Sequence, residues 1–195
     1  AATPAFTRRH RNPYRQWIGA QIRADGWAWA AAGKPELAAE LAYRDACWTH
    51  ERNGIYGEMM FAAIQAAAFV ETDPRRLVEI GLSEIPKDCT LAWRVRQCLT
   101  WIDEVAREEG IGEARVGAAP APFELLMERV ESELRGMSPV HTINNALVCV
   151  IAMITERMDT TRAITTSVMC GHDTDCNGAT VGSIVGAAGG RGAFG

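Results

Sequence analysis

Residues 59–70 set the strongest limit on the fold of this chain. They are apolar at every position except Gln65. A helix with apolar side chains on all sides has no face suited to water, so it must be buried among other elements. We therefore expect a central buried helix at 59–70, with the rest of the chain packed around it.

The remaining signals also predict helices. Pro35 and Pro74 stand where proline fits the first turn of a helix, and Asp73 is a typical helix cap. The glycines and prolines of residues 110–122 predict a loop or a variable insertion. No segment alternates apolar and polar residues as a strand does. We expect an all-α fold in a single helical domain over residues 1–195, with further helices at 35–50, 75–82, 91–108, 124–134, 144–156 and 160–169.

Composition favours a soluble protein of the cytoplasm. The net charge of -4 argues against a nucleic-acid partner, and the basic cluster at 8–11 is too short to follow a phosphate backbone. Six cysteines without a C-x-x-C spacing indicate reduced thiols. Neither a signal peptide nor an apolar span long enough for a membrane is visible. Composition leaves the oligomeric state open.

Residues 170–177 carry the clearest chemical pattern. Asp173 and Asp175 stand two residues apart, directly after the glycine break at Gly171. We expect this turn to join two helices, so that both carboxylates face one point, and hard oxygen ligands suit Mg²⁺ or Mn²⁺. A simpler interpretation is that Asp173 caps the next helix, Asp175 is solvated, and the glycines that follow only pack, namely Gly178, Gly182 and Gly186.

The run Asp173-Thr174-Asp175-Cys176-Asn177-Gly178-Ala179 resembles the C-terminal metal motif of the ADP-ribosylglycohydrolase family, in which an Asp-x-Asp-Thr turn supplies ligands to a two-metal centre. The segments 18–25, 42–58 and 141–146 are similar to bacterial members in the same order. The resemblance covers essentially the whole chain and implies a compact many-helix bundle.

The resemblance implies that Asp173, Asp175 and Cys176 are ligands of Mg²⁺ or Mn²⁺. Cys176 stands where the motif usually has threonine, and a thiol is a poorer ligand for a hard cation than a hydroxyl. Cys170, His172 and Cys176 are the ligand types of zinc, but their spacing fits no recognised zinc pattern.

The resemblance also places His50 near bound ADP-ribose, with Asn53, Gly54 and Tyr56 shaping the same pocket. Each has a structural alternative: a helix cap or packed ring for His50, a tight turn for Asn53-Gly54, and core packing for Tyr56. We expect ion pairs or helix surface for the acids that lie in similar stretches, Asp25, Asp45 and Glu58. For the tryptophans, core packing is preferred to an adenine-stacking platform at Trp17, Trp27 and Trp29.

The family's first metal motif, Thr-Asp-Asp-Thr, has no counterpart here, because the chain contains no adjacent Asp-Asp pair. We expect the chain to be the later part of the family's domain, incomplete at its N-terminus and at its C-terminus. The general base would then lie upstream, so no catalytic residue is assigned. We expect little or no catalysis by this chain alone unless the missing groups are supplied.

The resemblance implies metal-dependent hydrolysis of the glycosidic bond between ADP-ribose and an acceptor, which is a protein side chain or a small conjugate. Such cleavage needs oriented ribose hydroxyls and an activated water, because the anomeric carbon gains oxocarbenium character. The alternative is an inactive ADP-ribose-binding or structural relative, as with the lens crystallins that resemble this family. The linkage cleaved and the choice between Mg²⁺ and Mn²⁺ stay open.

Overall fold

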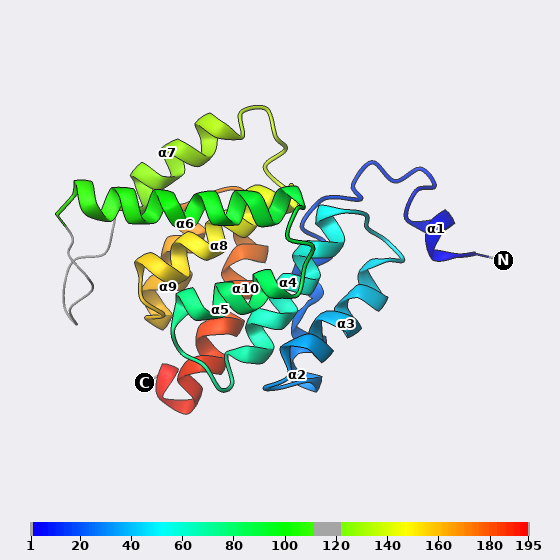
Figure 1. Cartoon of the computed structure of the whole chain (residues 1–195), viewed down its shortest axis with the longest axis horizontal. Coiled ribbons are helices and arrows are strands. Elements are labelled where there is room, and N and C mark those ends of the chain that lie inside the picture. The colour runs from blue at the N-terminus through cyan, green and yellow to red at the C-terminus, as the bar shows by residue number, and fades with distance from the viewer. Residues whose placement is uncertain (1, 111–121, 195) are drawn as a thin grey trace.

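The computed structural model describes residues 2–110 and 122–194, and within these ranges it contains helices and no β-strand. The predicted all-α fold is therefore confirmed. Figure 1 shows the helices, which in chain order are α1 Pro4–Thr7, η1 Gln21–Arg23, α2 Asp25–Ala30, α3 Pro35–Ala46, α4 Asn53–Ala67, α5 Pro74–Ser83, α6 Thr90–Glu108, α7 Phe123–Glu133, α8 Thr142–Thr155, α9 Thr160–Met169, α10 Thr174–Gly189 and η2 Gly190–Phe194.

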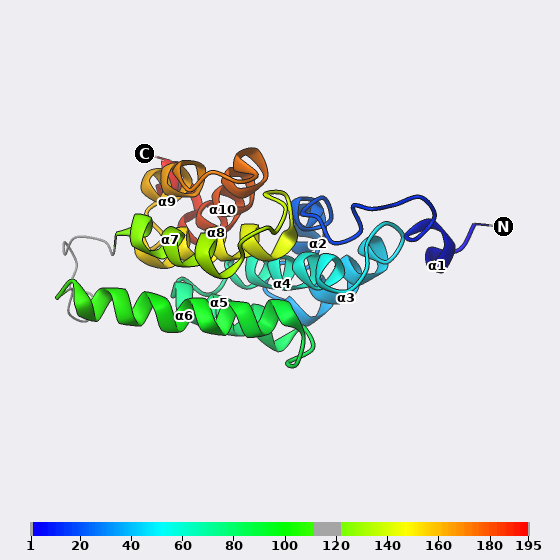
Figure 2. The same ribbon diagram turned by 90° about the horizontal axis from the view of Figure 1, so that it is seen from above.

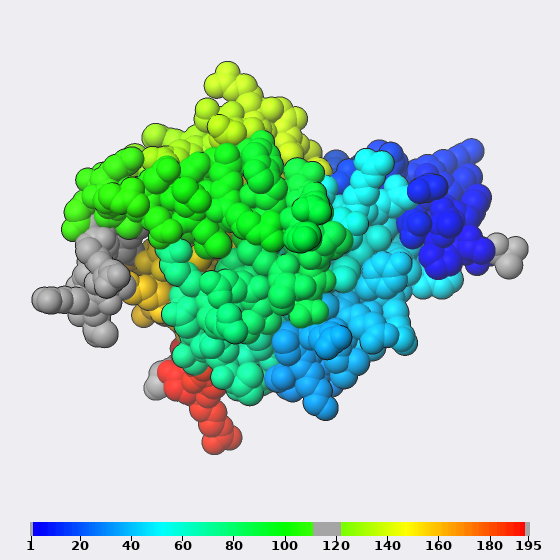
Figure 3. Space-filling view, viewed as in Figure 1, coloured from blue at the N-terminus to red at the C-terminus, as the bar shows by residue number. Residues whose placement is uncertain are grey.

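Helices α4 and α8 form the centre of the molecule. Nearly every residue of both is buried, including Met60 and Phe61 of α4 and Leu147 and Ile151 of α8. In Figure 2, α5 and α6 lie on one side of this pair, and α9 and α10 lie on the other. Figure 3 shows the side chains of α5 and α6 largely covering the pair on the face nearest the viewer. The central buried helix expected at 59–70 is thus confirmed as far as Ala67, but α4 begins earlier, at Asn53, and Phe69 and Val70 lie beyond its end and are exposed.

Local signals fixed most helix starts. Pro35 and Pro74 lie in the first turns of α3 and α5, and Asp73 accepts a capping hydrogen bond from the Arg76 backbone N–H at 2.8 Å. Helix α3 ends at Ala46 instead of running to residue 50. The short helices η1 and α2 were not predicted. Among the described helices, none is both long enough and apolar enough to cross a membrane.

Candidate metal and substrate site

The turn between α9 and α10 reverses the chain within four residues, 170–173. Gly171 and His172 both have left-handed backbone, with φ of 75° and 60°. Glycine adopts this conformation freely, whereas histidine does so at a cost. The reversal places Asp173 at the N-cap of α10 and Asp175 in its first turn. The positive end of the helix dipole stabilises negative charge at this position.

Asp173, Asp175 and Cys176 form a compact group of candidate ligands, whose ligand atoms all lie within 4.8 Å of one another. The Asp173 side chain accepts no capping hydrogen bond within the described part of α10. The interpretation of Asp173 as a side-chain cap is therefore wrong. Two neighbouring carboxylates, of which Asp173 makes no capping bond, fit a hard cation such as Mg²⁺ or Mn²⁺.

Cys176 fits such a cation less well than its two neighbours. Burial raises the pKa of its thiol to about 12, helped by a hydrogen bond with Asp173 and by the charges of Asp173 and Asp175. The sulfur therefore holds its proton and is also a soft ligand. The zinc interpretation is wrong for the described residues, because Cys170 and His172 do not join any ligand group with Cys176.

The glycines of α10 pack against α9. A Cβ atom at Gly178 would lie 3.2 Å from Val168 Cγ2, and one at Gly182 would lie 3.5 Å from Ile164 Cδ1. These two glycines therefore lie against side chains of α9. Helix α10 is thereby seated on α9, which fixes the direction in which its first turn points.

Asn145 ties the turn at 170–173, the candidate metal turn, to the start of α8. Its Oδ1 accepts hydrogen bonds from the Asp173 backbone N–H at 3.0 Å and from Asn177 Nδ2 at 2.9 Å. Its Nδ2 donates to the carbonyls of Pro139 and His141, both at 2.8 Å. The side chain is fully buried and uses its whole hydrogen-bonding capacity. Asn145 therefore acts as a clamp on the turn that carries the carboxylates.

A buried polar chain continues from this clamp toward α4. The Cys149 thiol donates to Asn177 Oδ1 at 3.6 Å and accepts from Gln21 Nε2 at 3.9 Å. Gln21 Oε1 accepts from Thr142 Oγ1 at 3.1 Å, and a Cβ atom at Gly57 would lie 2.4 Å from the same hydroxyl. This chain was not predicted from the sequence, although the polar residues inside the apolar helix α8 were a usable signal.

His50 lies just after α3 and is 7% exposed. Its ring packs against two glycines: a Cβ atom at Gly54 would lie 3.0 Å from Cδ2, and one at Gly19 would lie 3.6 Å from Nε2. Thr49 Oγ1 is 2.8 Å from Nδ1. Burial lowers the pKa of the ring to about 4, so it is neutral at pH 7. The backbone N–H of His50, and not its ring, bonds the Ala46 carbonyl at the end of α3.

Asn53 and Gly54 form the first turn of α4, so their interpretation as an independent tight turn is wrong. Asn53 accepts from the Leu91 backbone N–H at 3.0 Å and donates to Gln16 at 2.9 Å. A Cβ atom at Gly54 would lie 2.6 Å from the Arg15 carbonyl oxygen, so only glycine fits without a shift. Tyr56 is half-buried and packs against the core.

Arg23 organises the polar groups around His50. It donates to Asp45 at 2.8 Å, to the Gly19 carbonyl at 3.0 Å and to Thr49 Oγ1 at 3.1 Å. Burial of Asp45 favours the neutral acid, but the hydrogen bond from Arg23 leads a set of opposing interactions that lower the pKa of Asp45. Asp45 is therefore a structural ion-pair partner, as expected.

Glu58 differs from this expectation. It is fully buried, and its Oε2 lies 3.7 Å from Arg23 Nη2, which is longer than a hydrogen bond. Burial raises its pKa to about 9, and the charge of Asp45 adds to the effect. Glu58 therefore holds a proton at neutral pH instead of forming an ion pair.

Asp25 binds a neutral partner, because Ser183 Oγ donates to its Oδ2 at 2.7 Å and so ties α2 to α10. The tryptophans differ from one another. Trp27 packs against the core, and Trp17 lies against Tyr14 with ring centroids 4.4 Å apart. Trp29 is 55% exposed, so core packing is the wrong prediction for this residue.

The structure therefore brings the candidate residues together in two groups. Asp173, Asp175 and Cys176 form one, at the start of α10. His50 and Gly54 are in contact and form the other, next to Asn53 and near the start of α4. Among the described residues, the buried polar chain leads from Asn145 to Thr142, whose backbone N–H donates to the Gln16 carbonyl at 3.0 Å. Asn53 donates to Gln16 Oε1 at 2.9 Å, so Gln16 connects this chain to the second group.

Comparison with known proteins assigns the chain to a family. A model of the ADP-ribosylglycohydrolase family, described as "ADP-ribosylglycohydrolase", matches residues 3–194. No curated protein and no solved structure matches the chain. The family acts on ADP-ribosylated substrates and is generally metal-dependent, which agrees with a pair of uncommitted carboxylates at a glycine turn. By a match over nearly its whole length, the chain belongs to the ADP-ribosylglycohydrolase family.

Proposed function

We propose that this chain takes part in hydrolysis of the glycosidic bond between ADP-ribose and an acceptor, with Mg²⁺ or Mn²⁺ as cofactor, once the general base and the Thr-Asp-Asp-Thr ligands that its sequence lacks are supplied. The observation that carries the proposal is the convergence of the Asp173 and Asp175 carboxylates, which the described residues leave free of capping bonds. A structural protein has no use for two such carboxylates held together. This feature favours the enzyme over a purely structural relative.

Asp173 and Asp175 would hold the cation. A divalent cation bound there supplies a Lewis acid for the ribose oxygens and lowers the pKa of bound water. Asn145 keeps the turn in place, because its Oδ1 binds the Asp173 backbone N–H directly. Outer partners of this kind orient metal-binding side chains.

We also propose that His50, Asn53, Gly54 and Tyr56 shape the pocket for the substrate. The support is the way the chain is arranged around His50: glycines at 19 and 54 let the backbone approach the ring. The low pKa keeps the ring neutral at pH 7. His50 would therefore contribute shape and a hydrogen bond to the substrate, and not a positive charge.

Mn²⁺ binding tests this function directly. Isothermal titration would compare the unmodified chain with a double variant, Asp173→Asn with Asp175→Asn. A matched double variant, Asp88→Asn with Glu109→Gln, removes two exposed charges elsewhere. We expect Mn²⁺ affinity to fall by at least tenfold in the first variant and to stay unchanged in the second, because each carboxylate is a direct ligand.

A release assay then tests the reaction. ADP-ribosyl-arginine and ADP-ribosyl-serine peptides are incubated with Mn²⁺, Mg²⁺ or EDTA and either this chain or a longer chain that carries the Thr-Asp-Asp-Thr motif, and free ADP-ribose is measured. Metal-dependent release that disappears with Asp173→Asn and Asp175→Asn supports the proposal. Equal Mn²⁺ binding by the unmodified chain and by that double variant would refute the metal assignment.

A further inference from the structure

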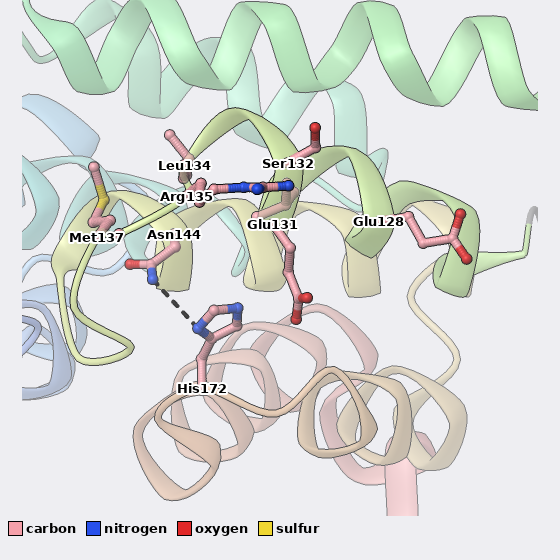
Figure 4. A pocket seen from close by; sticks show the side chains of 10 residues that line it. Glu128, Glu131, Ser132, Leu134, Arg135, Met137, Asn144 and His172 are labelled. Carbon is pink, nitrogen blue, oxygen red and sulfur yellow. Dashed lines mark hydrogen bonds between the residues drawn. The ribbon is translucent and has the colours of Figure 1, made fainter.

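A cavity of about 470 Å³ lies beside the metal turn (Figure 4). Helix α7, the connection 134–137 and the start of α8 form its walls, and His172 closes the side next to Asp173. Val130, Leu134 and Met137 give it apolar surface. This volume and this mixture of apolar walls with a few polar groups are typical of ligand pockets.

The hydrogen bonds of Asn144 define what the cavity offers a ligand. Its Nδ2 donates to the Ser138 carbonyl at 3.0 Å, which fixes the orientation of the amide. The same Nδ2 is 3.3 Å from His172 Nδ1, which must therefore be the acceptor. The ring hydrogen of His172 is then on Nε2. The cavity lining thus contains a defined donor, His172 Nε2–H, and a defined acceptor, Asn144 Oδ1.

Both of these atoms lack a partner among the described residues, and both are buried. Asn144 is 1% exposed. A buried polar group without a partner is unfavourable, so a ligand that supplies complementary groups gains binding energy from each. Both atoms are nearly sealed from water, so a ligand must displace lining side chains to reach them. Glu131 and Arg135 are exposed and can rotate.

The charges around the cavity disfavour a ligand that carries phosphate groups. The charged residues that line the cavity are two acids, Glu128 and Glu131, and one base, Arg135. Within the described ranges, none of the three forms an ion pair. Asp173 and Asp175 lie directly beyond His172 in the chain. Figure 4 shows the Glu131 carboxylate on the side of the cavity that His172 faces. A diphosphate would be repelled here, whereas a cation is attracted.

We propose that this cavity binds the acceptor side of the substrate, as a peptide segment with a positively charged side chain. A peptide carries both groups that the lining needs: its carbonyl accepts from His172 Nε2–H, and its N–H donates to Asn144 Oδ1. The positive side chain faces Glu131. The inference rests on the proposed function, because only a site next to Asp173 would receive the group attached to ADP-ribose.

Fluorescence anisotropy of an unmodified, labelled pentapeptide of lysine and glycine tests the proposal. A glutamate–glycine peptide of the same length and free lysine are the comparison ligands. The protein variants are Glu131→Gln and His172→Phe. The matched control is Glu124→Gln, which removes an exposed charge from the same helix outside the cavity.

We expect the lysine peptide to bind and the glutamate peptide not to bind. Glu131→Gln and His172→Phe should each weaken binding about tenfold, as expected for one lost hydrogen bond to a charged or buried group. Glu124→Gln should have no effect. Glu131 is exposed, so its variant keeps the fold even if His172→Phe does not.

Three results would overturn the proposal: no binding of the lysine peptide, equal binding after Glu131→Gln, or equal affinity for free lysine, which would indicate a small cationic ligand. Mn²⁺-dependent binding of ADP-ribose is measured separately. If the peptide binds and ADP-ribose does not, the proposed function fails and the cavity remains a peptide site. If ADP-ribose binds and the peptide does not, only the cavity proposal fails.

Discussion

The buried carboxyl group of Glu58 should make the stability of this protein depend on pH. Glu58 is fully buried in α4, and the nearby Arg23 already donates to Asp45, Thr49 and the Gly19 carbonyl. Burial, with the charge of Asp45 second, raises the pKa of Glu58 from 4.5 to about 9. Between these two values the folded protein holds a proton that the unfolded chain lacks. The free energy of unfolding must therefore fall as pH rises through this range.

Buried histidines act in the opposite direction. Burial lowers the pKa of His50 from 6.5 to about 4, and burial also lowers the pKa of His141. Between pH 4 and 6.5 the unfolded chain binds a proton at His50 that the folded protein does not, so stability rises with pH there. Below pH 6.5 the contributions of Glu58 and His50 offset each other. Between pH 6.5 and 9 only the contribution of Glu58 remains of these two, so the free energy of unfolding falls as pH rises.

The size of the effect follows from linkage. One proton contributes about 1.4 kcal/mol per pH unit, so the free energy of unfolding should fall by roughly 3 kcal/mol between pH 6.5 and 8.5. Glu58→Gln keeps the size of the side chain and does not ionise. We expect this variant to lose the decline and to be more stable than the unmodified protein at pH 8.5.

Urea unfolding at pH 6.5, 7.5 and 8.5 measures the slope. The control is Glu79→Gln, which removes an exposed carboxylate paired with Arg76 on α5 and should leave the slope unchanged. The reasoning is refuted if the unmodified protein is equally stable at the three pH values. It is also refuted if Glu58→Gln shows the same decline as the unmodified protein.

Two further predictions concern the clamp and the close approach at α4. Asn145→Ala should weaken Mn²⁺ binding about tenfold, because it removes the acceptor of the Asp173 backbone N–H. Asn53→Ala, which removes the acceptor of the Leu91 backbone N–H, should lower the free energy of unfolding and leave Mn²⁺ affinity unchanged. Titration with Mn²⁺ and urea unfolding separate the two effects. Gly54→Ala should cost about 1–3 kcal/mol of stability, because its Cβ atom would lie 2.6 Å from the Arg15 carbonyl oxygen. Gly26→Ala, in α2 with no described heavy atom within 4 Å of its Cβ, should stabilise by about 0.5–1 kcal/mol. Equal urea midpoints for Gly54→Ala and Gly26→Ala would contradict the predicted difference in stability.

Much of the fold could be predicted because helix starts depend on nearby residues. Pro35, Asp73 and Pro74 act within one turn of their own positions, and the starts of the two helices that they begin were predicted correctly. The start of α4 was missed because it depends on a distant contact. Gly54 lies against the Arg15 carbonyl, and nothing in the Asn-Gly pair reveals that partner.

The candidate site likewise has features that local sequence predicts and features that depend on distant contacts. Asp173 and Asp175 could be identified from spacing, because a turn of a few residues brings them together whatever surrounds it. The protonation state of Glu58 could not be predicted from the sequence, because its raised pKa depends on burial and on the charge of Asp45, which lies on another helix. The exposed ring of Trp29 likewise depends on how α2 lies on the core.

The buried chain from Thr142 to Asn145 gives a physical reason for polar residues in the most apolar helix of the protein. Helix α8 is buried along nearly its whole length, so each polar side chain in it must find a partner or destabilise the fold. Thr142, Asn145 and Cys149 find partners on η1, on α10 and at the turn before it. An apolar substitution at Asn145 would leave the Asp173 N–H and Asn177 Nδ2 without their acceptor. The polar residues of α8 thus hold the metal turn in a fixed position relative to η1 and α4, where the candidate substrate residues lie.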